Sequence, residues 1–473
     1  MGGFFGIVSK LDCAYDLFFG VDYHSHLGTR RGGMAMYDTK LGFQRAIHNI
    51  ESAPFRTKFE KDVEEMRGCT GVASISDFEP QPLLFRSHLG AYAVCTVGKI
   101  NNEEQLINDV LGRSRHFLEM SGGRINATEL VAALISESGS IPEGIRRAQE
   151  RIDGSMCILV LTPNGIYAAR DYLGRLPVLL GKREDGFAIS FESFAYEKVG
   201  YEDLRELGPG EVVLVTPEAV EVIYPPREQM RVCAFLWTYY GYPNSHYEGR
   251  NVEVMRYRCG EIMAENDIRE NNLAQDCDLI AGVPDSGTAH AIGYSGRSGI
   301  RFARPFVKYT PTWTRSFTPV NQAMRSLVAR MKLVTVRELI TDKHMLLVDD
   351  SIVRGTQTRE TIQLLHAGGA KSIHVRSACP PLVYGCKYLN FSRSGKVRDM
   401  IAQVVINELE GPKGFEHLPE YADATTDRGK AMVERIRKDL DFTSLRFQTL
   451  DGVLEAIGIA REKVCTYCWT GKE

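Results

Sequence analysis

The stretch HMLLVDDSIVRGTQTRETIQLLHAGGA (residues 344–370) decides the fold of the second half of this chain. Residues 345–348 are all apolar, which suits a buried strand of a parallel sheet. From Thr358 onward, apolar residues at Ile362, Leu365 and Ala367 have a spacing that predicts a packed helix. The turn between them therefore lies at the carboxyl end of a strand, where open α/β sheets bind ligands.

This turn combines two acids with a run of hydroxyls and backbone amides. Asp349 and Asp350 repel each other, so they need hydroxyls, amides or a metal to offset their charge. Residues Ser351 to Thr358 supply hydroxyls, Gly355 and amides at a helix N-terminus, an arrangement that binds phosphate. A ribose 5-phosphate fits, with its diol on the carboxylates and its phosphate in the loop. The alternative is a turn of ordinary helix-capping residues.

The pattern of apolar residues changes along the chain and predicts two domains, 1–230 and 231–473. The chain has 473 residues, enough for two or three domains, and 44% of them are hydrophobic. Short apolar strands fill the first part, with helices expected near Glu103–Leu111 and Ala127–Glu137, which predicts mixed α/β structure with antiparallel sheet. From about Asp276 the pattern is that of parallel βα units. The charged stretch 414–448 is expected to form helices on the surface.

Composition argues against several classes of function. The formal net charge is −3, which predicts no nucleic-acid partner. No run of eighteen apolar residues and no secretory signal is present, so we expect a cytoplasmic protein without a membrane partner. Gly6 stands where a myristoylation site needs Ser or Thr. Eleven cysteines are not expected to form a disulfide framework in this compartment, although Cys465 and Cys468 are spaced to share a metal or a disulfide.

The string LLVDDSIVRGTQT (346–358) resembles the phosphoribosylpyrophosphate (PRPP) motif of type I phosphoribosyltransferases, and specifically that of the glutamine PRPP amidotransferase family. The resemblance covers about residues 1–473. It implies an N-terminal Ntn-hydrolase-like αββα sandwich followed by a type I phosphoribosyltransferase domain with a parallel sheet.

Two further stretches resemble ligand loops of the same family. GVPDSGTAHAIGYSGRSGI (282–300) resembles the loop in which Ser286 approaches pyrophosphate and magnesium, and VKYTPTWTRSFTPVNQAMR (307–325) resembles the loop that closes over PRPP. The middle of the closing loop departs from the family pattern by an inserted residue. Taken alone, the first reads as a turn and the second as a solvated basic loop. The resemblance implies Mg²⁺ on Ser286, Asp349 and Asp350, and PRPP on Asp285, Ser286, Gly287, Lys308, Arg315, Asp349, Asp350, Ser351, Ile352, Val353, Arg354, Gly355, Thr356 and Thr358.

Four cysteines match the ligand positions of the iron–sulfur branch of this family: Cys233, Cys386, Cys465 and Cys468. Four thiolates are what a [4Fe–4S] cluster needs, and the C-terminal segment would carry two of them. Zinc is chemically possible with the same set. We favour the cluster because of the resemblance.

The same resemblance indicates that the N-terminal glutaminase site has lost its chemistry. The family's catalytic cysteine, which attacks the glutamine amide, aligns with Gly2, and glycine has no side chain to attack with. The family's carboxylate-binding Arg, oxyanion Asn and amine-binding Asp align with Ser74, Val97 and Ala127. Cys13 and Ser9 lack the Gly-x-x-Gly turn that Gly3 and Gly6 provide after position 2, so we do not expect them to substitute.

We therefore expect an enzyme of purine biosynthesis that forms 5-phosphoribosylamine from PRPP, using free ammonia or ammonia from a separate glutaminase. A catalytically idle paralogue that binds PRPP or purine nucleotides and regulates a true amidotransferase is the alternative. A salvage transferase that uses a purine base ranks third, because a glutaminase scaffold and cluster ligands have no role there. Family membership also implies a homo-oligomer, a tetramer, that responds to purine nucleotides.

Overall fold

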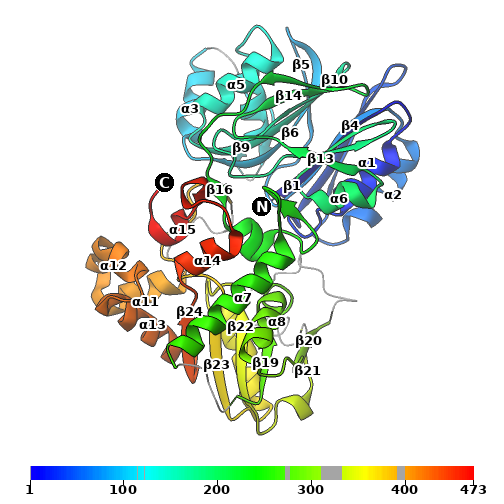
Figure 1. The fold of residues 1–473 in the computed structure, drawn as a ribbon. Helices are drawn as coiled ribbons and strands as arrows, with labels where there is room; N and C mark the ends of the chain where they lie inside the picture. The colour runs from blue at the N-terminus through cyan, green and yellow to red at the C-terminus, as the bar shows by residue number, and fades with distance from the viewer. Residues whose placement is uncertain (1, 114–115, 122, 272–276, 310–332, 391–399) are drawn as a thin grey trace.

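The computed structural model describes residues 2–113, 116–121, 123–271, 277–309, 333–390 and 400–473 (Figure 1). Its N-terminal half contains two antiparallel sheets. The first has the order β13-β11-β12-β1-β4-β2-β3 and the second the order β15-β14-β10-β9-β6-β5. Their strands are β1 (Gly2–Ser9), β2 (Arg31–Asp38), β3 (Gly42–Asn49), β4 (Thr70–Ser76), β5 (Leu83–Ser87), β6 (Gly90–Ile100), β9 (Gly154–Thr162), β10 (Gly165–Ala169), β11 (Leu179–Arg183), β12 (Gly186–Ser190), β13 (Glu202–Glu206), β14 (Val212–Val215) and β15 (Val220–Tyr224).

Helices cover the outer face of each sheet, so the layers run helix, sheet, sheet, helix (Figure 1). Against the first sheet lie α1 (Ala14–Asp22), α2 (Phe55–Glu65) and α6 (Ser193–Lys198); on the second lie α3 (Glu103–Leu111), α4 (Ala127–Ile135) and α5 (Ile141–Arg151). The predicted αββα sandwich is confirmed. Both predicted helices are present, although the second ends at Ile135.

Strand β1 shows why both faces of a sheet are apolar here. Phe5 packs on α1, where a Cβ on Gly20 would lie 2.3 Å from the Phe5 ring. The next residue, Gly6, faces Leu159 and Ile166 of the second sheet. Because β1 is covered by helices on one side and by the second sheet on the other, its residues are buried along its whole length.

The second half is built on a four-stranded parallel sheet of order β19-β22-β23-β24. Its strands are β19 (Leu279–Gly282), β22 (His344–Asp349), β23 (Ser372–Ser377) and β24 (Ser444–Phe447). The main helices are α7 (Val252–Arg269), α8 (Gly287–Ser298), α10 (Thr356–Ala367), α11 (Ile401–Glu410), α12 (Leu418–Ala422), α13 (Asp427–Asp439), α14 (Leu450–Ile457) and α15 (Tyr467–Thr470). Short pairs complete it: β16 (Val232–Cys233) with β25 (Val464–Cys465), and β20 (Phe306–Lys308) with β21 (Leu333–Thr335).

The deciding stretch folds as predicted, with one exception in its helix. Residues 345–348 lie in β22, and Ile362 and Leu365 of α10 are buried in the core of the second half. Ala367 is exposed, because it falls on the outer face of the last turn of α10. The prediction for 414–448 was incomplete: this region holds α12 and α13, but also β24, which pairs with β23 and completes the sheet.

The two halves meet along a polar seam and along the C-terminal segment. Glu192 of the first half is buried and accepts hydrogen bonds from His26 at 2.8 Å, from Tyr247 at 2.6 Å and from the Ser245 hydroxyl. Helices α14 and α15 lie where the halves meet (Figure 1). Among the helices of the described residues, none is long and apolar enough to cross a membrane.

Candidate functional site

The two acids end β22 and are held by neighbouring hydroxyls. Asp349 and Asp350 are both buried, at 8% and 5% exposure. Ser286 donates its hydroxyl to Asp350 Oδ2, and Ser351 donates to Asp350 Oδ1 at 2.6 Å. Burial raises the pKa of Asp349 well above its ordinary value, and the charge of Asp350 raises this pKa further. The two carboxylates are therefore buried side by side, with Arg256 close enough to Asp350 for their charges to interact, and they suit a ligand that brings hydroxyls or a cation.

The loop 284–287 reaches this strand end by backbone contacts. The Val283 amide donates to the Val348 carbonyl at 2.9 Å, which fixes the loop beside the acids. A Cβ on Gly287 would lie 2.4 Å from the Val348 carbonyl oxygen, so a side chain there would force α8 away from β22. The predicted trio of Ser286, Asp349 and Asp350 is thus brought together at one edge of the sheet, along with the N-terminus of α8.

The turn 351–355 leads directly into α10. Gly355 adopts a left-handed conformation with φ of 71° and packs so tightly that a Cβ would lie 2.6 Å from Ile401 Cδ1. The side chain of Ile352 is buried in the core, so it can offer a ligand only its backbone. Arg354 and Thr356 are exposed and Thr358 is half-buried beside the N-terminus of α10.

Of the two cations predicted outside the 351–358 turn, one can be placed. Lys308, on β20, pairs with Asp285 Oδ2 at 2.9 Å. This pair places the ammonium group beside the 284–287 loop. Arg315 lies outside the described residues, as do residues 310–325 of the predicted closing loop.

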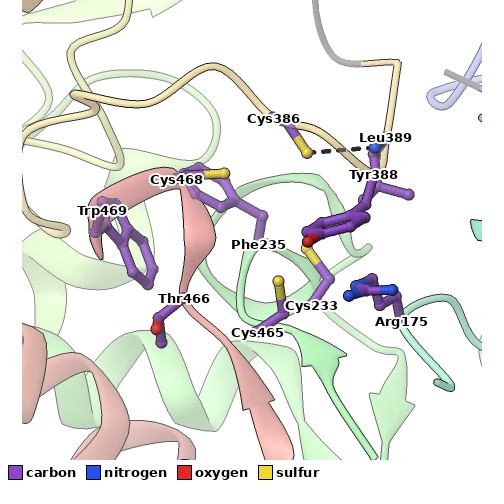
Figure 2. Close-up of a pocket in the computed structure, with 10 residues that line it drawn as sticks. All are labelled: Arg175, Cys233, Phe235, Cys386, Tyr388, Leu389, Cys465, Thr466, Cys468 and Trp469. Atoms are coloured by element: carbon purple, nitrogen blue, oxygen red, sulfur yellow. Dashed lines mark hydrogen bonds between the residues drawn. The ribbon is translucent and has the colours of Figure 1, made fainter. Parts of the chain in front are cut away.

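The four predicted cysteines line one pocket, together with Arg175, Phe235, Tyr388, Leu389, Thr466 and Trp469 (Figure 2). Cys233 and Cys465 are opposite each other in the parallel pair β16–β25. Cys468 follows on α15, and its carbonyl accepts from the Tyr384 amide at 3.1 Å, which ties α15 to the loop of Cys386. The Leu389 amide donates to Cys386 Sγ at 3.3 Å, which Figure 2 shows as a dashed line.

Three of the four thiols of this pocket have a raised pKa, and the fourth, Cys386, has a lowered one. Burial raises the pKa of Cys233 and of Cys465 above the ordinary thiol value. Between Cys386 and Cys468, a shared hydrogen bond lowers the pKa of Cys386 and raises that of Cys468. In the described part of the chain, no three His, Cys, Asp or Glu side chains lie close enough to bind a single metal ion.

Gly2 lines a second pocket, with Ser76, Phe78, Glu79, Gln81, Thr96, Val97, Gly98, Leu176, Leu389 and Asn390. Among these lining residues, all in the described part of the chain, Glu79 is the one ionisable side chain. Burial raises the pKa of Glu79 above its ordinary value. Asn390 donates to the Gly98 carbonyl at 3.3 Å, so the second half of the chain closes this pocket.

The surroundings of Gly2 leave little room for a side chain. A Cβ at this position would lie 2.6 Å from the carbonyl oxygen of Ile75 on β4. The Ser74 hydroxyl is turned toward the Gln81 carbonyl at 3.3 Å, and Ala127 begins α4. Neither Cys13 nor Ser9 lines the pocket: Cys13 donates to the Gly68 carbonyl at 3.4 Å, and Ser9 donates to Asp185 at 3.0 Å.

Comparison with known proteins agrees with this geometry. Residues 73–195 match the model of the glutamine amidotransferase domain family. An amidophosphoribosyltransferase from Archaeoglobus fulgidus is 28% identical over 458 residues, 94% of this chain and 92% of that protein. The chloroplastic amidophosphoribosyltransferase of Vigna aconitifolia is 30% identical over 399 residues, 83% of this chain and 73% of that protein. The chain belongs to the amidophosphoribosyltransferase family.

The solved glutamine PRPP amidotransferase of B. subtilis, complexed with ADP and GMP, superposes with a TM-score of 0.83 at 26% identity, covering 99% of this chain and 96% of the other.

Some residues of this amidophosphoribosyltransferase family member were not predicted from its sequence. Arg175 in the cysteine pocket, and Glu79 and Asn390 in the Gly2 pocket, reach these places through contacts between distant parts of the chain. Their local sequence did not indicate which pocket they reach. The cysteine pattern was the one available signal that distant segments meet here, since it joins residue 233 to the C-terminal segment.

Proposed function

We propose that this chain is an enzyme of purine biosynthesis that forms 5-phosphoribosylamine from PRPP and ammonia. In this reaction the bond from C1 of the ribose to pyrophosphate breaks, a bond from C1 to nitrogen forms, and the ammonia nitrogen loses a proton. The paired acids at the end of β22, with Ser286 and the α10 N-terminus beside them, carry the proposal. Asp349 and Asp350 would bind the ribose diol, and the 351–358 turn would bind the 5-phosphate.

The residues at this edge fit Mg²⁺, which prefers oxygen ligands and is commonly bound through one or two carboxylates plus substrate phosphates. Asp349, Asp350 and Ser286 would hold it. Their fit rests on two buried neighbouring carboxylates whose repulsion a cation would offset. When bound, the ion would neutralise charge on the departing pyrophosphate. The protein's own part is to orient the ribose and to bring Lys308 to the same edge.

We further propose that the N-terminal half has no glutaminase activity. Gly2 provides no nucleophile, and the 2.6 Å approach of the Ile75 carbonyl leaves no room for one without a backbone shift. The lining of the Gly2 pocket in the described residues includes no cation for the carboxylate of glutamine, and Glu79 would repel that carboxylate. Ammonia would then come from solution or from a separate glutaminase partner.

The proposal for the cysteine pocket is a [4Fe–4S] cluster on Cys233, Cys386, Cys465 and Cys468. A single zinc ion holds its thiolates about 3.8 Å apart, as Zn–S bonds of about 2.3 Å require. Among the described residues, Cys386 and Cys468 share a hydrogen bond, but no three of these side chains are gathered for one metal ion. A four-iron cluster gives each thiolate its own iron, so it suits a set that lines a shared pocket from several sides.

Purine nucleotides are proposed as further ligands, because the B. subtilis relative was solved in complex with ADP and GMP. Homo-oligomer formation, as a tetramer, and a cytoplasmic location are proposed with the same function. Nucleotide binding is checked by isothermal titration with GMP and ADP, and the oligomeric state by light scattering.

The experiment that tests the main proposal follows pyrophosphate release from PRPP and Mg²⁺ with ammonium chloride, glutamine or adenine as acceptor. Release with ammonium chloride alone supports the proposal. Release with glutamine would contradict the proposed loss of glutaminase activity. No release with any acceptor, together with measurable PRPP binding, would instead support the regulatory paralogue.

A further inference from the structure

Arg175 reaches the cysteine pocket from the N-terminal half of the chain (Figure 2). Its backbone is fixed from two sides. The Arg175 amide donates to Asp171 Oδ1 at 3.0 Å, and the Arg175 carbonyl accepts from the Cys233 amide at 3.1 Å. The turn that carries the arginine is therefore joined directly to the strand that carries a proposed cluster ligand.

The side chain of Arg175 is buried beside the thiol of Cys465, and no carboxylate of the described residues forms an ion pair with it. It is 3% exposed, and its guanidinium carbon lies 3.5 Å from the centroid of the Tyr388 ring. One Nη donates a long hydrogen bond of 3.5 Å to the Gly154 carbonyl, whereas Nε has no hydrogen-bond partner among the described residues. A buried, always charged guanidinium with an orphaned N–H is costly unless an anion or acceptor lies beside it.

We propose that Arg175 is the counter-ion of the iron–sulfur cluster, and that its charge stabilises the cluster's reduced form. This inference rests on the cluster of the proposed function. A cluster core held by four thiolates carries net negative charge and gains one more negative charge on one-electron reduction. Charges attract strongly when little water lies between them, so a buried cation favours the more negative, reduced state. Arg175 would not bind iron itself, because the four cysteines hold the irons; it would act on the cluster through its charge.

Lys387 offers a matched comparison in the same neighbourhood. It follows the proposed ligand Cys386, and its Nζ lies 5.7 Å from the centroid of the Tyr388 ring. However, its side chain is 40% exposed and it pairs with Glu473 at 3.5 Å. Water and the carboxylate screen this charge, so we expect Lys387 to have little influence on the cluster.

The test uses the full chain, reconstituted with iron and sulfide under argon and analysed first for iron and acid-labile sulfide. The reduction potential is then measured by titration with a chemical reductant, followed by visible absorbance and by the electron paramagnetic resonance signal of the reduced cluster. We expect Arg175→Gln to lower the potential, Arg175→Lys to retain most of the wild-type value, and Lys387→Gln to leave it unchanged.

The outcomes show whether the charge of Arg175 sets the reduction potential of the cluster. An unchanged potential in Arg175→Gln, or an equal drop in Arg175→Lys and Arg175→Gln, would overturn the inference, because charge would then not be the cause. If Arg175→Gln does not fold, the comparison of Arg175→Lys and Lys387→Gln with the wild type still decides: a large drop in Arg175→Lys overturns the inference. Wild-type protein that takes up no iron would overturn the proposed cluster itself, which the iron analysis identifies before any titration.

Discussion

The acid turn of β22 and the Gly2 pocket lie in the two halves of one chain, and they differ in what their side chains can do. Around Asp350, two serine hydroxyls, a second carboxylate and the N-terminus of a helix converge. Around Gly2, the strand pairing is equally regular, but position 2 itself carries no side chain, where the resemblance places the catalytic cysteine. Under the proposed loss of glutaminase activity, the fold persists around a site that no longer reacts, because sheet pairing and core packing do not depend on the few residues that react.

The largest expected effect on activity comes from the acid turn of β22. Asp350→Asn removes the carboxylate that accepts from Ser286 and Ser351, so we expect ammonia-dependent turnover of PRPP to fall by about 10²-fold or more, equivalent to about 2.7 kcal/mol. Steady-state kinetics of pyrophosphate release measure this. Asp451→Asn, at an exposed acid paired with Arg461, is the control. Equal activity of the two variants would remove the acid turn from the mechanism.

A smaller effect is expected from Lys308→Gln. Lys308 pairs with Asp285 beside the same edge of the sheet, and we expect it to contribute one charge-assisted hydrogen bond to bound PRPP. Its loss should raise the KM for PRPP about tenfold, which corresponds to about 1.4 kcal/mol. Lys371→Gln, at an exposed lysine paired with Asp342, serves as control. A KM for PRPP that does not move would place Lys308 outside the binding site.

The acid turn also predicts a dependence of stability on pH. The pKa of Asp349 is raised in the folded chain, so the folded state binds this proton more tightly than the unfolded state does. The contribution of Asp349 to stability is therefore full below its ordinary pKa and is lost as pH rises through the raised value. Asp349→Asn should be more stable than wild type at neutral pH, by about 2–4 °C in Tm for each kcal/mol gained, and this difference should shrink near pH 4.

Urea unfolding of wild type and Asp349→Asn across pH 4 to 8 measures this difference in free energy. The same variant should lose PRPP turnover. A variant that is less stable than wild type at neutral pH would mean that the two carboxylates do not repel each other in the folded chain.

The smallest expected effect is at Gly2. Gly2→Cys should show no hydrolysis of glutamine, because a Cβ would meet the Ile75 carbonyl at 2.6 Å and because Ser74, Val97 and Ala127 leave the substrate without partners. Its ammonia-dependent release of pyrophosphate reports that the variant is folded. Glutamate formation by Gly2→Cys would show that only the nucleophile is missing, and the contrast between the two sites would then reduce to one residue.

Sequence patterns predicted most of the second half because its elements are regular. An apolar run gave β22, and apolar spacing gave the buried positions Ile362 and Leu365 of α10. Strand β24 was missed because Ser444–Phe447 is four residues long and lies in a charged stretch, so its place in the sheet depends on pairing with β23.

The same difference between local patterns and long-range contacts applies to the sites. The gathering of the acids with Ser286, and of the four cysteines around one pocket, could be predicted because motif or resemblance marks these residues in the sequence. Arg175, Glu79 and Asn390 could not, since each takes its position from segments far away in the chain. Arg175 meets Cys233 through backbone pairing, and Asn390 meets Gly98 across the boundary of the two halves.

The comparison between the two sites is tested most directly by measuring pyrophosphate release from PRPP and Mg²⁺ with ammonium chloride and, separately, with glutamine. We expect release with ammonium chloride and none above background with glutamine. Release with glutamine at a rate similar to that with ammonium chloride, or no release with either, would contradict it.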